Sequence, residues 1–161
     1  MGRHNCRTSG RIGQKEKQIM IKTIYILVGP QGAGKTYWCK NVLITDKRVT
    51  RISQDEQGKG GHMSLFMDYI QDGASLIVVD RMNFNREQRS RYIGPAMRQG
   101  YRIVIVLFKI DRATCLGRLA TRKDHPTIPI DADHDKILDV YFNQFEPPEP
   151  DEYDELQEVV C

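Results

Sequence analysis

Residues 29–36 read Gly29-Pro30-Gln31-Gly32-Ala33-Gly34-Lys35-Thr36, which matches the pattern GxxxxGK[ST] at every fixed position. Glycines let such a loop fold back so that successive backbone N–H groups point at phosphate oxygens. The uncharged apolar run at residues 23–28 predicts a buried strand before the loop, and a helix expected from Gly34 adds the positive end of its dipole. In this context Lys35 is placed to reach the β and γ phosphates of a nucleotide and the Thr36 hydroxyl to bind Mg²⁺. The segment is therefore predicted to hold a nucleoside triphosphate.

Apolar, β-rich runs alternate with helical patterns along the rest of the chain, which indicates parallel βαβ units. Further strands are expected at residues 49–53, 75–80, 102–108 and 156–160, and helices near residues 34–44, 62–71, 86–99, 111–121 and 131–145. The first of these helices is expected to bury Trp38, Val42 and Leu43. The predicted fold class is α/β, with about five parallel strands, right-handed crossovers and helices on both faces of the sheet.

Length and composition fit one folded domain, since the chain has 161 residues, of which 40% are hydrophobic and 28% charged. No run of 18 apolar residues occurs, and no apolar segment follows the basic N-terminus as in a secretory signal. We therefore expect no membrane association and a cytoplasmic protein, with a nuclear location, or the host cytosol for a viral protein, as alternatives.

The positive charge is concentrated at the N-terminus, where residues 1–20 carry a net charge of +4. The whole chain carries +3, so the remaining residues sum to −1. Such an arm is typical of a nucleic-acid contact or of a disordered leader, and the disordered leader is the favoured interpretation. The predicted organisation is an arm at residues 1–20, of open role, followed by a domain at residues 21–161.

The four cysteines are scattered singly, so no spacing indicates zinc or a redox pair. Cys39 and Cys115 fall within helical patterns and are expected to be small buried hydrophobic residues.

A triphosphate-binding loop fits a GTPase, an ATP-driven machine or a kinase. The small size argues against a machine, and the lack of an Asn-Lys-x-Asp segment that reads guanine argues against a GTPase. A kinase needs a base near the acceptor, an acid that organises the metal, and cations around the moving phosphoryl group. Asp55 follows the second strand and Asp80 ends the third, both at the edge of the sheet where ligands bind, although each also fits a turn or a helix cap.

Arg118 and Arg122 lie four residues apart and share one helical face beside the segment Lys123-Asp124-His125-Pro126. A lid that carries arginines would close over the triphosphate. The alternative is a solvated, basic helix C-terminus. Three aromatic residues could stack on a nucleic-acid base, but their periodic placement favours core packing: Tyr69, Phe84 and Tyr92.

Four blocks, in this order, resemble the polynucleotide 5′-hydroxyl kinases and the small P-loop kinases grouped with them. The likeness covers residues 22 to 160. The blocks are residues 29–36 with Trp38, Ile52-Ser53-Gln54-Asp55, residues 79–89 (VDRMNFNREQR), and Arg118 to Arg122 with His125-Pro126.

The resemblance implies a P-loop kinase fold with an arginine-bearing lid and assigns roles to particular residues. Asp55 would be the general base, with Lys35, Arg118 and Arg122 stabilising the transferred group. The donor, ATP or GTP, would be bound by Gly29, Pro30, Gln31, Gly32, Ala33, Gly34, Lys35, Thr36, Arg118 and Arg122. Mg²⁺ would be held by Thr36 and Asp80, and the acceptor by Lys59, Arg81, Asn83 and Arg86. The phage enzyme has an arginine three residues after its base where this chain has Gly58, so Lys59 or Arg81 is expected to substitute for it.

The expected activity is transfer of the γ-phosphoryl group to a 5′-hydroxyl end of RNA or DNA. Two alternatives stay open: a small-molecule kinase of the same fold, and a nucleotide-binding regulatory module with little turnover. The resemblance also allows for a ligase or phosphatase partner. It leaves open the oligomeric state, and whether the chain acts alone or as a domain of a larger enzyme.

Overall fold

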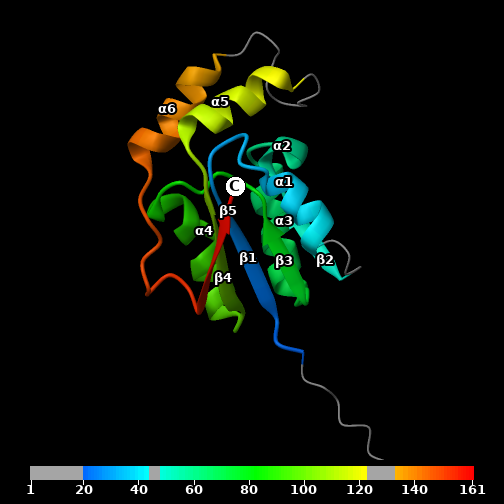
Figure 1. The fold of residues 1–161 in the computed structure, drawn as a ribbon. Helices are drawn as coiled ribbons and strands as arrows, with labels where there is room; N and C mark the ends of the chain where they lie inside the picture. The colour runs from blue at the N-terminus through cyan, green and yellow to red at the C-terminus, as the bar shows by residue number, and fades with distance from the viewer. Residues whose placement is uncertain (1–19, 44–47, 123–132) are drawn as a thin grey trace, which may run out of the picture.

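The computed structural model describes residues 20–43, 48–122 and 133–161, which form one five-stranded sheet in the order β2-β3-β1-β4-β5 (Figure 1). All pairings in the sheet are parallel. The strands are β1 (Thr23–Val28), β2 (Val49–Ile52), β3 (Leu76–Val79), β4 (Arg102–Lys109) and β5 (Glu155–Val160). The predicted α/β class with five parallel strands is therefore confirmed.

Strand β1 lies at the centre of the sheet, where Ile26 is in register with Val79 of β3 on one side and with Ile105 of β4 on the other. The chain adds β2 and β3 on one side of β1 and β4 and β5 on the other, so the strand order reverses at β1. In open α/β sheets ligands bind beyond the carboxyl ends of the strands at such a reversal. Residues 29–36 leave β1 at this point.

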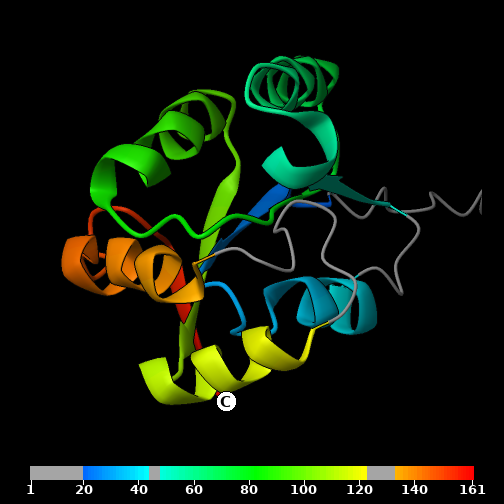
Figure 2. The ribbon, with the colours of Figure 1, turned by 90° about the horizontal axis from the view of Figure 1, so that it is seen from above.

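Helices cover both faces of the sheet, and alternate residues of the central strand contribute to the two cores (Figure 2). On one face Ile24 and Ile26 pack with α3 (Gly61–Asp72) and α4 (Arg86–Arg98). On the other face Leu27 packs in the cluster that contains Cys39 and Phe108, with Trp38 of α1 (Lys35–Trp38) against it. Burial on both faces explains why the strands read as continuous apolar runs.

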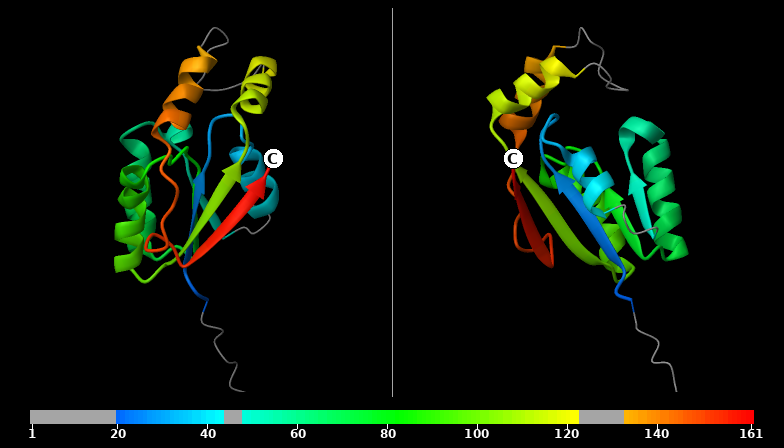
Figure 3. Two further views of the ribbon diagram at one scale, coloured as in Figure 1. Left: turned by 60° about the vertical axis from the view of Figure 1, so that its left-hand side comes forward. Right: turned by 45° about the vertical axis from the view of Figure 1, so that its right-hand side comes forward.

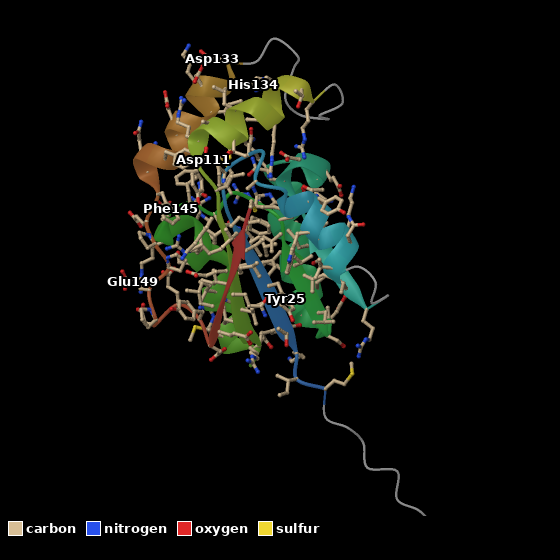
Figure 4. The ribbon with its side chains drawn as sticks, in the orientation of Figure 1. Tyr25, Asp111, Asp133, His134, Phe145 and Glu149 are labelled. Carbon is tan, nitrogen blue, oxygen red and sulfur yellow. The ribbon has the colours of Figure 1, made fainter. Side chains whose placement is uncertain are left out.

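Helices α5 (Arg112–Thr121) and α6 (His134–Gln144) lie beyond the carboxyl edge of the sheet, as the two views of Figure 3 show. They share a small core of Cys115, Leu119 and Leu138. Both begin at an aspartate that is labelled in Figure 4: Asp111 accepts a hydrogen bond from the Thr114 backbone N–H at 2.7 Å, and Asp133 accepts one from the Lys136 N–H at 3.1 Å. These two helices form the roof over the site.

The connector after α6 is held to the domain by a buried ion pair. The fully buried Arg89 of α4 donates to both carboxylate oxygens of Glu152, at 2.8 and 3.0 Å. It also donates to the carbonyl oxygens of Asn83, at 3.2 Å, and Glu146, at 2.9 Å. One guanidinium group therefore fastens the loop after β3 to the segment that leads into β5.

One local expectation is wrong, and one short helix was missed. The helix expected at residues 34–44 is only α1 followed by a π-helical turn, η1 (Cys39–Leu43), which leaves Val42 54% exposed instead of buried. A short helix, α2 (Gln54–Gln57), was not predicted. The N-terminal arm, up to residue 19, and the lid segment Lys123-Asp124-His125-Pro126 lie outside the described residues. Within the described part of the chain, no helix has the length and apolar character needed to cross a membrane.

Candidate active site

A polar cavity lies at the carboxyl edge of the sheet, where the loops after β1, β2 and β3 meet the end of α5. The structure brings together here seven of the side chains expected at the site, each of which lines the cavity: Gln31, Lys35, Thr36, Asp55, Asp80, Arg81 and Arg122. The neutral side chains Gln54, Met82 and Gln88 complete the wall.

The loop after β1 has the backbone shape that its glycines predict. Gly32 and Gly34 have φ angles of +82° and +91°, in the region that favours glycine. The loop also packs closely beneath α5, since a Cβ atom at Gly32 would lie 3.0 Å from the Cys115 carbonyl oxygen. The loop therefore turns its backbone toward the cavity and is covered on its other side.

Lys35 is buried at the centre of this loop. Its ammonium group donates to the carbonyl oxygens of Gly29, at 2.8 Å, and Pro30, at 2.7 Å. Burial lowers the Lys35 pKa to about 8, although the nearby Asp80 and Asp55 carboxylates oppose the shift. A phosphate group that replaced the carbonyl partners would favour the charged form of this lysine.

Thr36 and Asp80 are joined directly, because the Thr36 hydroxyl donates to Asp80 Oδ2 at 3.0 Å. The same carboxylate oxygen accepts from Nε and Nη2 of Arg51, at 2.9 and 2.6 Å, and the other terminal nitrogen of Arg51 pairs with Glu56. Arg51 was not among the expected site residues. Its only signal in the sequence is a charge near the carboxyl end of a strand. It connects the acid after β3 to the helix that carries Asp55.

Asp55 lies on α2, exposed at the cavity and close enough to Lys35 to affect its pKa. Its carboxylate has no hydrogen bond to any residue that the structure describes. The helix itself is held in place, because the Ser53 backbone N–H donates to the Gln57 side chain at 2.7 Å. The carboxylate is therefore available to a ligand while its backbone is fixed.

Both expected lid arginines face the loop. The Arg118 guanidinium donates to the Gly32 carbonyl oxygen at 3.2 Å, and Arg122, the C-terminal cap of α5, lines the cavity. These positions agree with cations that act on the phosphates of a bound nucleotide.

The expected acceptor residues are divided by the structure. Arg81 lines the cavity, whereas Lys59 is exposed outside its lining and Arg86 pairs with Asp151 on the surface. Asn83 is fully buried, and its amide donates to the Leu27 carbonyl oxygen at 2.8 Å. Asn83 thus supports the fold, and the structure does not place it, Lys59 or Arg86 where they would touch a ligand in the cavity.

The site fits a nucleotide with Mg²⁺. The glycine loop offers backbone N–H groups and a lysine to phosphate oxygens, and the hydroxyl of Thr36 with the carboxylate of Asp80 gives the hard oxygen ligands that Mg²⁺ prefers. Among the described residues no group of three or more histidine, cysteine or acidic side chains is arranged so that it could hold a metal ion by itself. Mg²⁺ would therefore depend on nucleotide oxygens and water for its remaining ligands.

A family model described as an AAA domain matches residues 24–148, which is most of the chain. The plant protein named transcription factor bHLH140, from Arabidopsis thaliana, is 31% identical over 121 residues. That match covers 69% of this chain and only 12% of the plant protein.

The solved structures that are similar in fold include a fungal RNA kinase and Kti12. A fungal RNA kinase superposes with a TM-score of 0.65 at 15% identity, covering 86% of this chain and 38% of the other. Kti12 of Chaetomium thermophilum, in complex with ADP-AlF3, superposes with a TM-score of 0.64 at 10% identity, covering 85% of this chain and 88% of the other. The chain thus has a nucleotide-binding, kinase-like P-loop fold and spans a minor part of both the plant protein and the RNA kinase.

Proposed function

We propose that this chain, which belongs to the AAA domain family, transfers the γ-phosphoryl group of ATP or GTP to the 5′-hydroxyl end of a nucleic acid. One observation carries the proposal: the Asp55 carboxylate shares a cavity with Lys35 and Arg122 and has no hydrogen-bond partner among the described residues. A nucleotide-binding module needs the loop and the lysine, but it has no use for an unpaired carboxylate at the cavity.

In this proposal Asp55 accepts the proton of the acceptor hydroxyl. The acceptor oxygen then forms its bond to the γ-phosphorus while the bond from that phosphorus to the β–γ bridging oxygen breaks. The nucleoside diphosphate, ADP or GDP, is the leaving group. Positioning and charge stabilisation supply most of the catalysis in such a reaction.

The cations of the site are arranged around the donor. The loop N–H groups and Lys35 hold the β and γ phosphates, and Arg118 and Arg122 reach the same region from α5. Thr36 and Asp80 would hold Mg²⁺, which when bound neutralises charge on the phosphate oxygens. Arg51 donates to the Asp80 carboxylate and holds it beside the Thr36 hydroxyl.

A nucleic acid acceptor is supported by Arg81, a cation that lines the same cavity as Asp55. A fold shared with a solved RNA kinase is consistent with this choice, and so are the four sequence blocks that resemble polynucleotide kinases.

The test offers γ-labelled ATP and GTP with RNA and DNA oligonucleotides that end in a 5′-hydroxyl or a 5′-phosphate. Label is expected only on the 5′-hydroxyl ends. Asp55→Asn should reduce transfer by about 10²–10⁴-fold, the usual effect of removing a general base, and should leave ATP affinity nearly unchanged. Asp68→Asn, at an exposed aspartate on α3, is the matched control and should behave as wild type.

Other outcomes would contradict the proposal. Label on a nucleoside, sugar or metabolite but on no oligonucleotide would show a small-molecule kinase of the same fold. Tight nucleotide binding without transfer to any acceptor would show a regulatory module. Equal loss of transfer and of ATP binding in Asp55→Asn would remove Asp55 from the role of base.

A further inference from the structure

Three hydrogen bonds in series run from the cavity through the core to the end of α2. The Arg81 guanidinium donates to the Tyr92 hydroxyl at 2.7 Å. The same hydroxyl lies 3.0 Å from Nε2 of His62, whose Nδ1 lies 2.9 Å from the carbonyl oxygen of Gly58.

The donors and acceptors of this series can be assigned in only one way for a neutral histidine. The Gly58 carbonyl can only accept, so His62 Nδ1 carries the hydrogen and Nε2 is an acceptor. Tyr92 therefore donates to Nε2, and its oxygen accepts from Arg81, which can only donate. Each group has a partner of the opposite kind, so the series orients Arg81 through two buried side chains.

The middle of the series cannot easily move. Tyr92 is fully buried and His62 is 4% exposed, and the Tyr92 ring packs edge-on against Phe66 with ring centroids 5.2 Å apart. Burial also raises the pKa of the Tyr92 phenol, which keeps its hydroxyl protonated and able to donate. Arg81, at the end, is the one member that lines the cavity.

Arg81 has donors to spare. Within the described residues its guanidinium makes this one hydrogen bond and no ion pair, although a guanidinium carries five N–H donors. The carboxylates of Asp55 and Asp80 line the same cavity, but Asp80 pairs with Arg51, and no ion pair joins Arg81 to either acid in the described part of the chain. A held, uncompensated guanidinium at a cavity wall is suited to a phosphate anion.

The far end of the series explains why the arrangement matters for transfer. Gly58 directly follows α2, the helix that carries Asp55. The three hydrogen bonds therefore link the backbone beside Asp55 to the guanidinium of Arg81 across α3 and α4. The series thus joins the helix that carries the proposed base to a cation that lines the same cavity.

We propose that Tyr92 and His62 are positioning residues that hold Arg81 to bind the phosphate next to the reacting hydroxyl of the acceptor. This inference rests on the proposed function and adds to it the feature of the acceptor that is recognised: a phosphodiester beside the 5′-terminal nucleoside. A neutral acceptor would gain nothing from this arrangement.

The experiment compares two acceptors in steady-state kinetics, a 5′-hydroxyl oligonucleotide and the same oligonucleotide with a neutral methylphosphonate at its first linkage. Tyr92→Phe removes one hydroxyl and keeps the ring. It should raise the acceptor KM by about tenfold for the natural oligonucleotide, the effect of one hydrogen bond to a charged group, with the KM for ATP unchanged. The methylphosphonate acceptor should bind more weakly to wild type and show no further loss with the variant.

Tyr101→Phe is the matched control, because the Tyr101 hydroxyl is also in the core and donates to the Ala74 carbonyl at 2.7 Å, away from the cavity. It should lose stability without a change in acceptor KM. Arg81→Met, at the cavity wall, tests the anion contact while it keeps the buried Tyr92 and His62 side chains, and it should match or exceed the effect of Tyr92→Phe.

Acceptor KM values that are the same in Tyr92→Phe and Tyr101→Phe would overturn the inference, and so would an equal loss with both acceptors. If Tyr92→Phe fails to fold, wild-type kinetics in Arg81→Met would overturn it. These outcomes are distinct from failure of the proposed function, which would appear as wild-type protein that places no label on any 5′-hydroxyl end.

Discussion

The buried pair of Arg89 and Glu152 gives a quantitative prediction about stability. Arg89 is fully buried and Glu152 is 4% exposed, so neither charge has water to replace its partner. Among the described residues, Arg89→Met would leave the Glu152 carboxylate with the Glu149 backbone N–H, at 2.8 Å, as its one remaining donor. Removing one partner of a buried pair costs about 3–5 kcal/mol, a large fraction of the roughly 5–15 kcal/mol by which domains are stable.

Urea unfolding followed by the fluorescence of Trp38, the single tryptophan, measures this loss. Trp38 packs edge-on against Phe108 on the opposite face of the sheet, so it reports unfolding of the whole domain rather than of the connector. Arg91→Met is the matched control on the same helix. Arg91 pairs with Glu87 at 2.8 Å in a pair whose side chains are 51% and 75% exposed, and its loss should cost about 0.5 kcal/mol or less.

The double variant Arg89→Met/Glu152→Met should recover much of the lost stability, because it leaves no unpaired charge in the core. The reasoning fails if Arg89→Met costs less than about 1 kcal/mol, or if the double variant is destabilised by the sum of the two single changes.

Three further predictions concern the phosphate-binding loop and Asp80, the carboxylate proposed to bind Mg²⁺. Nucleotide phosphates should restore the charged form of Lys35, whose pKa is lowered to about 8, so the affinity for nucleotide should fall as pH rises through 8. Calorimetry in two buffers near pH 8.5 should detect proton uptake on binding, and no uptake would contradict this prediction. Gly32→Ala should lose about 1–3 kcal/mol and destabilise more than Gly34→Ala in thermal unfolding, because both have positive φ but only Gly32 lies against α5; equal losses would remove the packing argument. Arg51→Met should lower the free energy of unfolding in EDTA by about 3 kcal/mol, since Asp80 loses its paired cation. Mg²⁺ with nucleotide should restore part of this stability. An unchanged melting temperature in EDTA would refute this role of Arg51.

Much of the fold could be predicted because the strands are buried on both faces and therefore read as apolar runs. The position of the site could be predicted because the strands are parallel. Parallel strands end at a common edge, so a loop after β1, an aspartate after β2 and an aspartate after β3 all lie along that edge. Lys35, Asp55 and Asp80 were predicted together for this reason.

The features that were missed depend on pairings between distant segments. Arg51 reaches Asp80 because β2 pairs with β3, and the sequence does not reveal which strand lies beside which. Asn83 was expected at the acceptor but is buried because its amide meets the end of β1, again a consequence of strand order. Val42 is exposed because the backbone widens into a π-helical turn, which the apolar periodicity does not record.

The ends of β1 and β3 are fastened to each other by two contacts. The Gly29 backbone N–H donates to the Met82 carbonyl oxygen at 3.0 Å, and the Asn83 amide donates to Leu27. The loop proposed to bind the donor and the segment that bears Arg81 are therefore joined directly and should move as one unit. A substitution that breaks either contact should therefore weaken the binding of donor and acceptor together. A substitution in α5 can weaken the binding of the donor alone.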